Sequence, residues 1–137
     1  MQAIQDMKEP LYREKTGSLP NFLLVGAAKA GTTTLSYYLQ QHPDIFMSPM
    51  KEPRFFSAAS VPQELEGRGD RWSETTRIRK FDQYLRLFRN AGHERCLGEA
   101  SAEYLFYYQD VIPRVLELLG DIPIIIILRN PVQRAFS

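Results

Sequence analysis

A turn that combines small, cationic and hydroxyl side chains lies between a short apolar run and a helical pattern. It covers residues 26–34 (GAAKAGTTT). Small residues let a backbone wrap closely around a ligand, and the N–H groups at the start of a helix point into the same hollow. Lys29 adds a positive charge, and the three threonines add hydroxyl donors, one of which can also cap the helix. The turn therefore predicts a site for a phosphate or sulfate group, although an ordinary strand-to-helix turn with a solvated lysine also fits it.

The position of the lysine distinguishes this turn from a nucleoside-triphosphate loop. A Walker A loop has the form G-x-x-x-x-G-K-[ST], with the lysine directly after the second glycine. Gly26 and Gly31 keep this spacing, but Thr32 occupies the lysine position and Lys29 lies two residues before Gly31. We therefore expect a ligand with a 5′-phosphate-like group that need not be a triphosphate. A P-loop kinase or nucleotide hydrolase, dependent on magnesium and a triphosphate, is the alternative enzyme class.

An arginine stands where a second apolar strand is expected to leave the core. Arg129 follows residues 124–128, and Ser137 falls eight positions later, in the first turns of an expected helix. Ligands of open α/β sheets bind at the carboxyl ends of the strands, and a guanidinium there can hold a phosphate through two parallel hydrogen bonds. The Ser137 hydroxyl can reach the same anion. We expect Arg134 to form a structural or surface pair instead.

The elements that would position these residues alternate between strand and helix. Strands are expected over 21–26, 45–48, 96–101 and 124–128, and helices over 32–41, 81–91, 105–119 and from Pro131 onward. Residues 124–128 (IIIIL) are continuously apolar, as in a strand buried on both faces of a parallel sheet. Residues 49–79 form a connector rich in proline and charge, which we expect to be mobile or to face the substrate. The alternation predicts an α/β fold with a parallel sheet.

Composition limits the classes of partner. The 137 residues are 44% hydrophobic and 24% charged, with a net charge of +1, which is typical of a soluble globular chain. Such a balance gives no field to recruit nucleic acid, so any anion site must be local. One cysteine, Cys96, provides neither a disulfide framework nor a zinc ligand set. Neither a secretory signal nor a membrane span of about 20 apolar residues is visible, so we expect a cytoplasmic location.

The two anion motifs together resemble those of the sulfotransferases that use 3′-phosphoadenosine 5′-phosphosulfate (PAPS). K-x-G-T-T-x-L after a strand is similar to the family's 5′-phosphosulfate loop, and R-N-P-x-x-R-A-x-S after a later strand is similar to its 3′-phosphate motif. The resemblance implies PAPS as donor, PAP as product and no metal. It also implies that Lys29 steadies the oxygen that leaves. The implied donor-binding residues are Lys29, Ala30, Gly31, Thr32, Thr33, Thr34, Arg129 and Ser137.

The same resemblance implies a catalytic base. Residues 51–56 (KEPRFF) resemble the E-x-x-F-F stretch of heparan-sulfate-type and bacterial sulfotransferases. This match implies that Glu52 removes the acceptor proton and that Lys51 lies close to the transferred group. From the residues alone, Glu52 can also be a surface carboxylate paired with Lys51 or Arg54. The two phenylalanines are expected in the core rather than on a substrate platform.

One stretch departs from the family pattern. Residues 98–104 (GEASAEY) resemble a segment in which heparan-type enzymes carry a lysine after the glutamate, near the acceptor, whereas this chain has Ala100. Glu99 and Ser101 are candidates to line the cleft or to have half-buried structural roles. The acceptor therefore stays open: a hydroxyl or amine of a small molecule, carbohydrate or lipid, with no nucleic acid.

The resemblance covers nearly all of residues 19–137. We predict a polar lead-in over 1–19 and the N-terminal, donor-binding part of a sulfotransferase domain over 20–137. The expected fold is a three-layer α/β fold, a parallel sheet with flanking helices similar to P-loop NTPases. We expect it to be incomplete at the C-terminus because a doubly wound sheet normally needs further strands. A truncated, catalytically inactive relative that only binds nucleotide is the non-enzymatic alternative.

Overall fold

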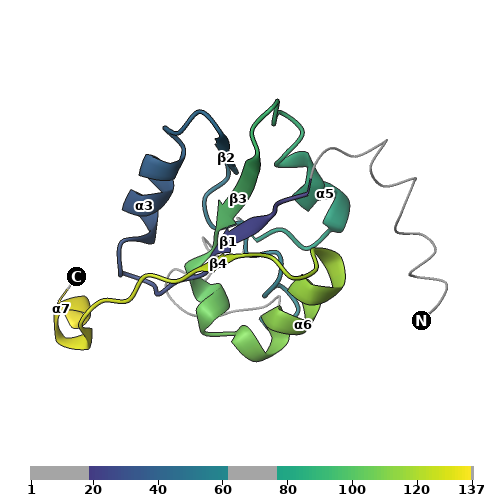
Figure 1. Ribbon diagram of the computed structural model, residues 1–137. Helices are drawn as coiled ribbons and strands as arrows, with labels where there is room; N and C mark the ends of the chain where they lie inside the picture. Colours follow the sequence, from purple (N-terminus) through teal and green to yellow (C-terminus); the bar gives the residue numbers. More distant parts are fainter. Residues whose placement is uncertain (1–18, 62–76, 137) are drawn as a thin grey trace.

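The computed structural model describes residues 19–61 and 77–136 (Figure 1). The strands are β1 (Phe22–Leu24), β2 (Ile45–Met47), β3 (Cys96–Ala100) and β4 (Ile124–Ile125). The helices are α3 (Thr32–Leu39), α5 (Phe81–Arg86), α6 (Tyr108–Leu118) and α7 (Pro131–Ala135), with a 3₁₀ turn η1 (Ala102–Leu105). The predicted lead-in lies outside the described residues except for Leu19, as do residues 62–76 of the predicted connector and Ser137.

One parallel sheet with strand order β2-β3-β1-β4 forms the centre of the fold. β1 lies inside the sheet, where Phe22 is paired with Gly98 of β3 and Leu23 with Ile124 of β4. A Cβ atom at Gly98 would lie 2.3 Å from the ring of Phe22. Glycine therefore lets this ring lie directly on β3. The predicted alternation of parallel strands and helices is confirmed.

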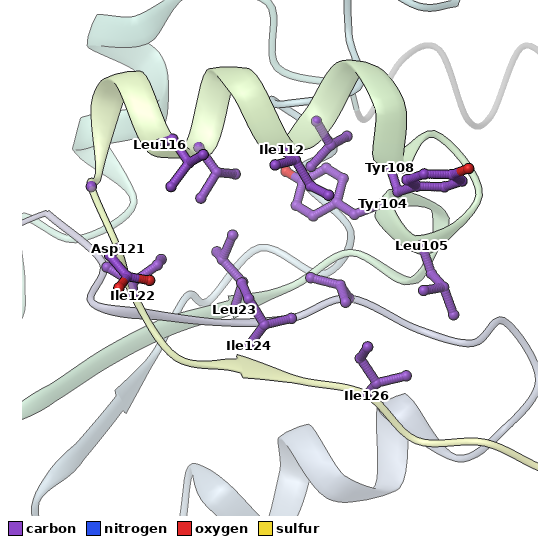
Figure 2. Close-up of a pocket in the computed structure, with 14 residues that line it drawn as sticks. Leu23, Tyr104, Leu105, Tyr108, Ile112, Leu116, Asp121, Ile122, Ile124 and Ile126 are labelled. Atoms are coloured by element: carbon purple, nitrogen blue, oxygen red, sulfur yellow. The ribbon is translucent and has the colours of Figure 1, made fainter.

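Helices cover both faces of the sheet. Figure 2 shows α6 on one side of β1 and β4 and α3 on the other side. Alternate residues of a strand point to opposite faces, and Leu23 and Leu97 belong to the main core with Val111 and Val115 of α6. The three-layer arrangement predicted from the sequence is therefore present. Among the described residues, no helix is both long and apolar enough to cross a membrane.

Helix α6 lies within the helix predicted over 105–119, and it ends one residue before the predicted end. Val111 and Val115 are buried, and the φ of Gly120 is 81°. The Gly120 N–H donates to the carbonyls of Val115 and Leu116, each at 3.2 Å, as in a glycine C-cap. Pro113 lies inside the helix and is exposed. Its ring therefore neither ends the helix nor enters the core.

The prediction that residues 124–128 are buried on both faces is wrong for the described structure. β4 is one of the two edge strands of the described sheet, and Ile124, Ile126 and Leu128 are 45%, 49% and 76% exposed. Backbone pairing with β1 continues to Ile127, whose N–H donates to the Gly26 carbonyl at 2.8 Å. An apolar cavity of about 210 Å³ lies between this strand and α6 (Figure 2). The exposure follows because no strand within residues 19–61 and 77–136 pairs with the outer edge of β4.

Candidate functional site

The glycine-rich turn leads from β1 to the start of α3. Helix α3 begins at Thr32, and Gly31 occupies the N-cap position with a φ of 111°. No described side chain caps this helix, so the predicted threonine cap is wrong. A hydroxyl caps a helix from the residue before its first helical one, and that residue is a glycine here. The first-turn N–H groups therefore have no side-chain acceptor from the described part of the chain, which suits an external anion.

The turn is open on the side where a ligand would bind. Lys29, Gly31 and the last two threonines are exposed, whereas Thr32 is buried. A Cβ atom at Gly31 would meet nothing within 4 Å. At Gly26, by contrast, a Cβ atom would lie 2.8 Å from the Cβ of Leu105. Gly26 therefore lets one side of the turn pack closely against η1, whereas the turn is open to solvent at Gly31.

The two predicted anion motifs meet at the carboxyl ends of β1 and β4. Arg129 Nη1 donates to the Lys29 carbonyl oxygen at 3.3 Å, across 100 positions of sequence. Arg129 is held at the start of α7, where the Asn130 side chain accepts from the Val132 N–H at 2.9 Å and Pro131 occupies the first turn. Ser137, the other predicted residue of this motif, lies outside the described residues.

A cavity of about 700 Å³ lies beside the turn. Lys29 lines it together with Glu103, Tyr107 and Arg134. The sequence predicts a structural or surface pair for Arg134, but its exposed side chain lines the same cavity as Lys29. The signal was its place five residues after Arg129, which puts both cations at the same end of the sheet.

Glu52 and Lys51 lie on the other side of the turn. They line a cavity of about 180 Å³ together with Thr32, Thr33 and Ala100. The structure thus brings the predicted base segment to the N-terminus of α3. Lys29 lies instead among the residues that line the larger cavity.

Hydrogen bonds to the end of β3 and the start of η1 hold the backbone and the carboxylate of Glu52. The Ala102 N–H donates to Glu52 Oε2 at 2.9 Å, and the Glu52 N–H donates to the Ala100 carbonyl at 3.2 Å. Arg54 Nε lies 3.8 Å from the same Oε2 atom, and the Glu52 side chain is only 17% exposed. The alternative of a carboxylate paired with Arg54 is therefore partly right, but Glu52 is not a free surface group.

The surroundings of Glu52 favour its protonated form more than water does. Burial raises the pKa of Glu52 above its ordinary value of 4.5. The Ala102 N–H and the charges of Arg54 and Lys51 act to lower this pKa, and the charge of Glu103 acts to raise it. A raised pKa brings a carboxylate closer to the basicity that proton removal near neutral pH requires.

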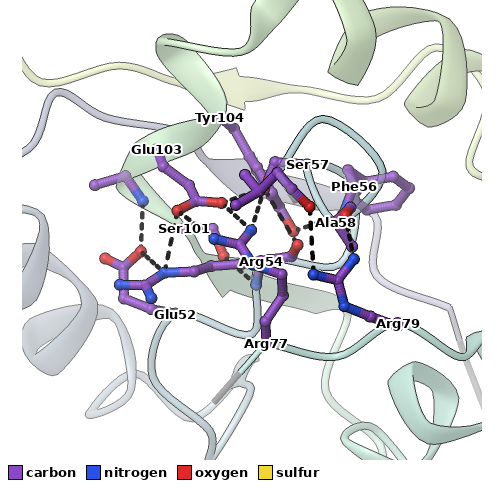
Figure 3. Close-up of polar contacts among 12 residues, drawn as sticks. Glu52, Arg54, Phe56, Ser57, Ala58, Arg77, Arg79, Ser101, Glu103 and Tyr104 are labelled. Carbon is purple, nitrogen blue, oxygen red and sulfur yellow. Dashed lines mark hydrogen bonds and ion pairs between the residues drawn. The ribbon is translucent and has the colours of Figure 1, made fainter. Parts of the chain in front are cut away.

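An ionic cluster that the sequence did not reveal supports the Glu52 segment (Figure 3). Arg54 Nε lies 3.3 Å from Glu103 Oε2, and Arg77 forms a second ion pair with Glu103. The Ser57 hydroxyl donates to the same carboxylate. Arg77 lies 23 positions beyond Arg54 in the sequence, so the only signal available was the density of charge in this region.

Glu99 and Ser101 do not line the cleft, and they are more than half-buried. Both are fully buried, and the Ser101 hydroxyl donates to Glu99 Oε2 at 2.8 Å. The hydroxyls of Tyr104 and Tyr84 donate to Glu99 Oε1 at 2.7 and 3.4 Å. Burial raises the pKa of Glu99 to about 7, and the hydrogen bonds from Tyr104 and Ser101 act against this rise.

The predicted core role of the two phenylalanines is confirmed. Phe55 is 3% exposed and Phe56 is fully buried. The Phe55 ring stacks on that of Tyr84 at a centroid distance of 4.5 Å, and the Phe56 ring meets that of Tyr104 edge to face at 5.7 Å. The segment that carries Glu52 is therefore anchored in the core through its own two phenylalanines.

Known proteins are similar to this chain along most of its length. The chain matches the sulfotransferase family over residues 20–137. It is 34% identical over 119 residues to the membrane-associated sulfotransferase kil1 of Dictyostelium discoideum, covering 87% of this chain and 22% of that protein. It is 33% identical over 137 residues to the bifunctional heparan sulfate N-deacetylase/N-sulfotransferase 2 of Homo sapiens, covering 95% of this chain and 14% of that protein.

A solved structure extends the likeness to three dimensions. The crystal structure of a sulfotransferase from Alicyclobacillus acidocaldarius matches with a TM-score of 0.83 and 48% identity, covering 87% of this chain and 48% of that chain. The chain thus spans about half the length of this bacterial protein and a smaller share of the two relatives above. Because the family match includes the glycine-rich turn, the Glu52 segment and the Arg129 motif, the chain belongs to the sulfotransferase family.

Proposed function

We propose that this protein transfers a sulfuryl group from PAPS to a hydroxyl or amine acceptor. The observation that carries the proposal is the cavity shared by Lys51 and Glu52 with Thr32 and Thr33. It sets a carboxylate with a raised pKa opposite a helix N-terminus that lacks a described side-chain cap. An anion held at that helix start would face the group that removes a proton from the acceptor.

The donor side offers two separate places for anionic groups, as PAPS requires. In this proposal, the N–H groups and side chains of residues 29–34 hold the 5′-phosphosulfate. Arg129 and Ser137 hold the 3′-phosphate, and Arg134 adds positive charge nearby. The adjoining cavity of about 700 Å³ lies within the size range of small-molecule and cofactor sites. The contact of Arg129 with the Lys29 carbonyl supports a fixed spacing between the two places.

The reaction is an in-line displacement at sulfur. A lone pair of the acceptor oxygen or nitrogen forms the new bond to sulfur, while the bond from sulfur to the 5′-phosphate oxygen breaks and its electron pair leaves with PAP. Glu52 takes the acceptor proton. Lys29 balances the charge that develops on the departing oxygen, and Lys51 lies beside the transferred group. Positioning and charge stabilisation do most of the work in this scheme.

The residues around Glu52 support a less specific proposal for the acceptor than for the donor. Ala100 lines the Glu52 cavity, and a lysine at this position would bring positive charge to it. Two relatives are named for carbohydrate chemistry: the heparan sulfate enzyme above and carbohydrate sulfotransferase 15 of Mus musculus. We propose a hydroxyl or amine of a small molecule, carbohydrate or lipid as acceptor. The cytoplasmic location stays a prediction.

Calorimetric binding of PAP, with ATP plus magnesium as comparator, tests the donor site. PAP should bind more tightly, and Arg129→Ala should weaken it by roughly 10- to 100-fold, the scale of a lost hydrogen bond between charged groups. Arg89→Ala, at an exposed position after α5, is the matched control and should change nothing. Preference for ATP with magnesium would point to a kinase or hydrolase.

Transfer of radiolabelled sulfate from PAPS tests the reaction itself. The acceptors are a glucosamine oligosaccharide, p-nitrophenol and a long-chain alcohol in detergent. Labelled product that requires Glu52 supports the proposal. Tight PAP binding with no labelled product from any of these acceptors would count against turnover and favour a relative that only binds nucleotide.

A further inference from the structure

Glu99 is a fully buried carboxylate that does not line the cavity containing Glu52. It lies in β3, and three hydroxyls donate to it, those of Ser101, Tyr104 and Tyr84. A buried carboxylate is costly to keep unless hydrogen bonds compensate it. A position that faces the core of a sheet is normally apolar. An acid at this position therefore indicates a role that requires a hydrogen-bond acceptor and that an apolar side chain could not provide.

Two of these hydroxyls connect Glu99 to the backbone of the Glu52 segment. The Arg54 N–H donates to Ser101 Oγ at 3.0 Å, and the Phe56 N–H donates to the Tyr104 hydroxyl oxygen at 3.2 Å. A hydroxyl has one proton and accepts through its lone pairs. Because Glu99 takes both protons, both oxygens present lone pairs to the backbone. Glu99 therefore orients two relays that end on alternate residues of one segment.

The segment needs such support because its backbone is strained. Glu52 has a φ of 53° and Arg54 a φ of 56°, and residues with side chains occupy this left-handed region at a cost of about 1–2 kcal/mol each. Strained backbone conformations persist where several independent contacts from the surrounding structure hold them in place. Here the contacts come from the junction of β3 and η1: Glu99, Ser101 and Tyr104 through the relays, and Ala100 and Ala102 directly on Glu52.

We propose that Glu99 is a positioning residue for Glu52: through Ser101 and Tyr104 it holds the backbone of residues 54–56 and so aims the Glu52 carboxylate at the helix start of α3. The consequence for catalysis rests on the proposed function, in which Glu52 is the base. The placement itself does not, because it concerns only where the carboxylate points. The charged groups that act on Glu52 are Lys51, Arg54 and Glu103. The variants that test the proposal leave all three in place.

The variants that test it remove one relay at a time. Ser101→Ala removes the link to Arg54, and Tyr104→Phe removes the link to Phe56. Tyr84→Phe is the matched control. The Tyr84 hydroxyl also donates to Glu99, but within the described part of the chain it contacts no backbone group of residues 54–56. Glu99→Gln is informative if it folds, since an amide accepts through one oxygen only. Circular dichroism and thermal unfolding show which variants are folded.

The first readout follows the placement without any turnover. In the wild type, the Ala102 amide donates to Glu52, so its nitrogen chemical shift should follow the ionisation of Glu52 in a pH titration. Glu52→Gln identifies that titration by abolishing it. Ser101→Ala and Tyr104→Phe should reduce its amplitude at least twofold, and Tyr84→Phe should leave it as in the wild type. The proposal would be overturned if both relay variants kept the wild-type amplitude. It would also be overturned if Tyr84→Phe lost as much amplitude as the relay variants.

The second readout separates positioning from donor binding. The relay variants should lower kcat by roughly 10- to 100-fold, the scale of a misplaced catalytic group, with PAP affinity within twofold of the wild type. Parallel losses of kcat and PAP affinity would mean a general loss of structure and would overturn the role. If Glu52→Gln keeps full turnover while the relay variants still lose the Ala102 titration, the base assignment fails and the placement stands.

Discussion

The proposed donor side of the site, around Lys29 and Gly31, and the proposed base side, around Glu52, are built in opposite ways. On the donor side, Lys29 and Gly31 are exposed around a helix start that no described side chain caps. On the base side, Glu52 is mostly buried, and Glu99 beneath it accepts from three hydroxyls. An anionic donor brings its own hydrogen-bond acceptors, so its site can stay open until binding. A base must keep its direction throughout, so the protein provides its partners.

The largest expected effect concerns the base side. Glu52→Gln removes the proposed proton acceptor but keeps the size of the side chain and an oxygen for the Ala102 N–H to contact. Turnover should fall by roughly 10²–10⁴-fold, the usual contribution of general base catalysis, and PAP affinity should stay the same. Steady-state kinetics and calorimetry measure the two effects. Glu94→Gln, in a surface loop, is the control, and unchanged turnover in Glu52→Gln would end its candidacy as base.

The next effect concerns the donor side. Lys29→Ala should lower turnover by roughly 10²–10³-fold, the scale found when a preorganised charge-stabilising group is removed. Because Lys29 is exposed, thermal stability should stay near that of the wild type. Lys80→Ala, next to α5, is the matched control. A loss of less than about threefold in a folded Lys29→Ala would contradict the role given to this lysine.

The buried carboxylate should make stability depend on pH. Burial raises the pKa of Glu99 from 4.5 to about 7, so the folded state holds this proton more strongly than the unfolded state. The stabilisation from this bound proton is fully present below about pH 4.5 and is lost as pH rises toward 7. The free energy of unfolding should fall by roughly 3 kcal/mol over this range. Urea unfolding between pH 4.5 and 7.5 measures it. Glu99→Gln should flatten this decline, whereas Glu94→Gln should not, because hydrogen bonds lower the pKa of Glu94.

The smallest effect tests how open the donor turn is. Gly31→Ala introduces no clash, since a Cβ atom there meets nothing within 4 Å, but φ is 111°. Its cost should be limited to backbone strain of about 1–2 kcal/mol. Gly26→Ala should cost more, because its Cβ atom would lie 2.9 Å from the Ala102 carbonyl oxygen. Equal losses in urea unfolding of the two variants would mean that the space above Gly31 is not open.

Much of the fold could be predicted because its signals are local. The glycine-rich turn, the apolar strands and the amphipathic α6 each depend on residues close together in the sequence. The meeting of Arg129 with Lys29 could also be expected, since parallel strands end at the same edge of a sheet. The predictions that were wrong concern details that depend on segments that are neighbours in space but not in sequence. The missing threonine cap depends on where α3 begins, and the exposure of Ile124 depends on what lies beside β4.

The sequence alone determined the family and the alternation of elements, and it predicted the residues that we propose for donor binding. It could not determine how Glu52 is held, because Ser101, Tyr104 and Glu99 act on it from about 50 positions away. Their spacing has no period, and whether a carboxylate such as Glu99 is exposed or buried follows from packing. Only the tertiary structure decides this, since burial and hydrogen bonding depend on which segments come into contact and not on the residue types themselves.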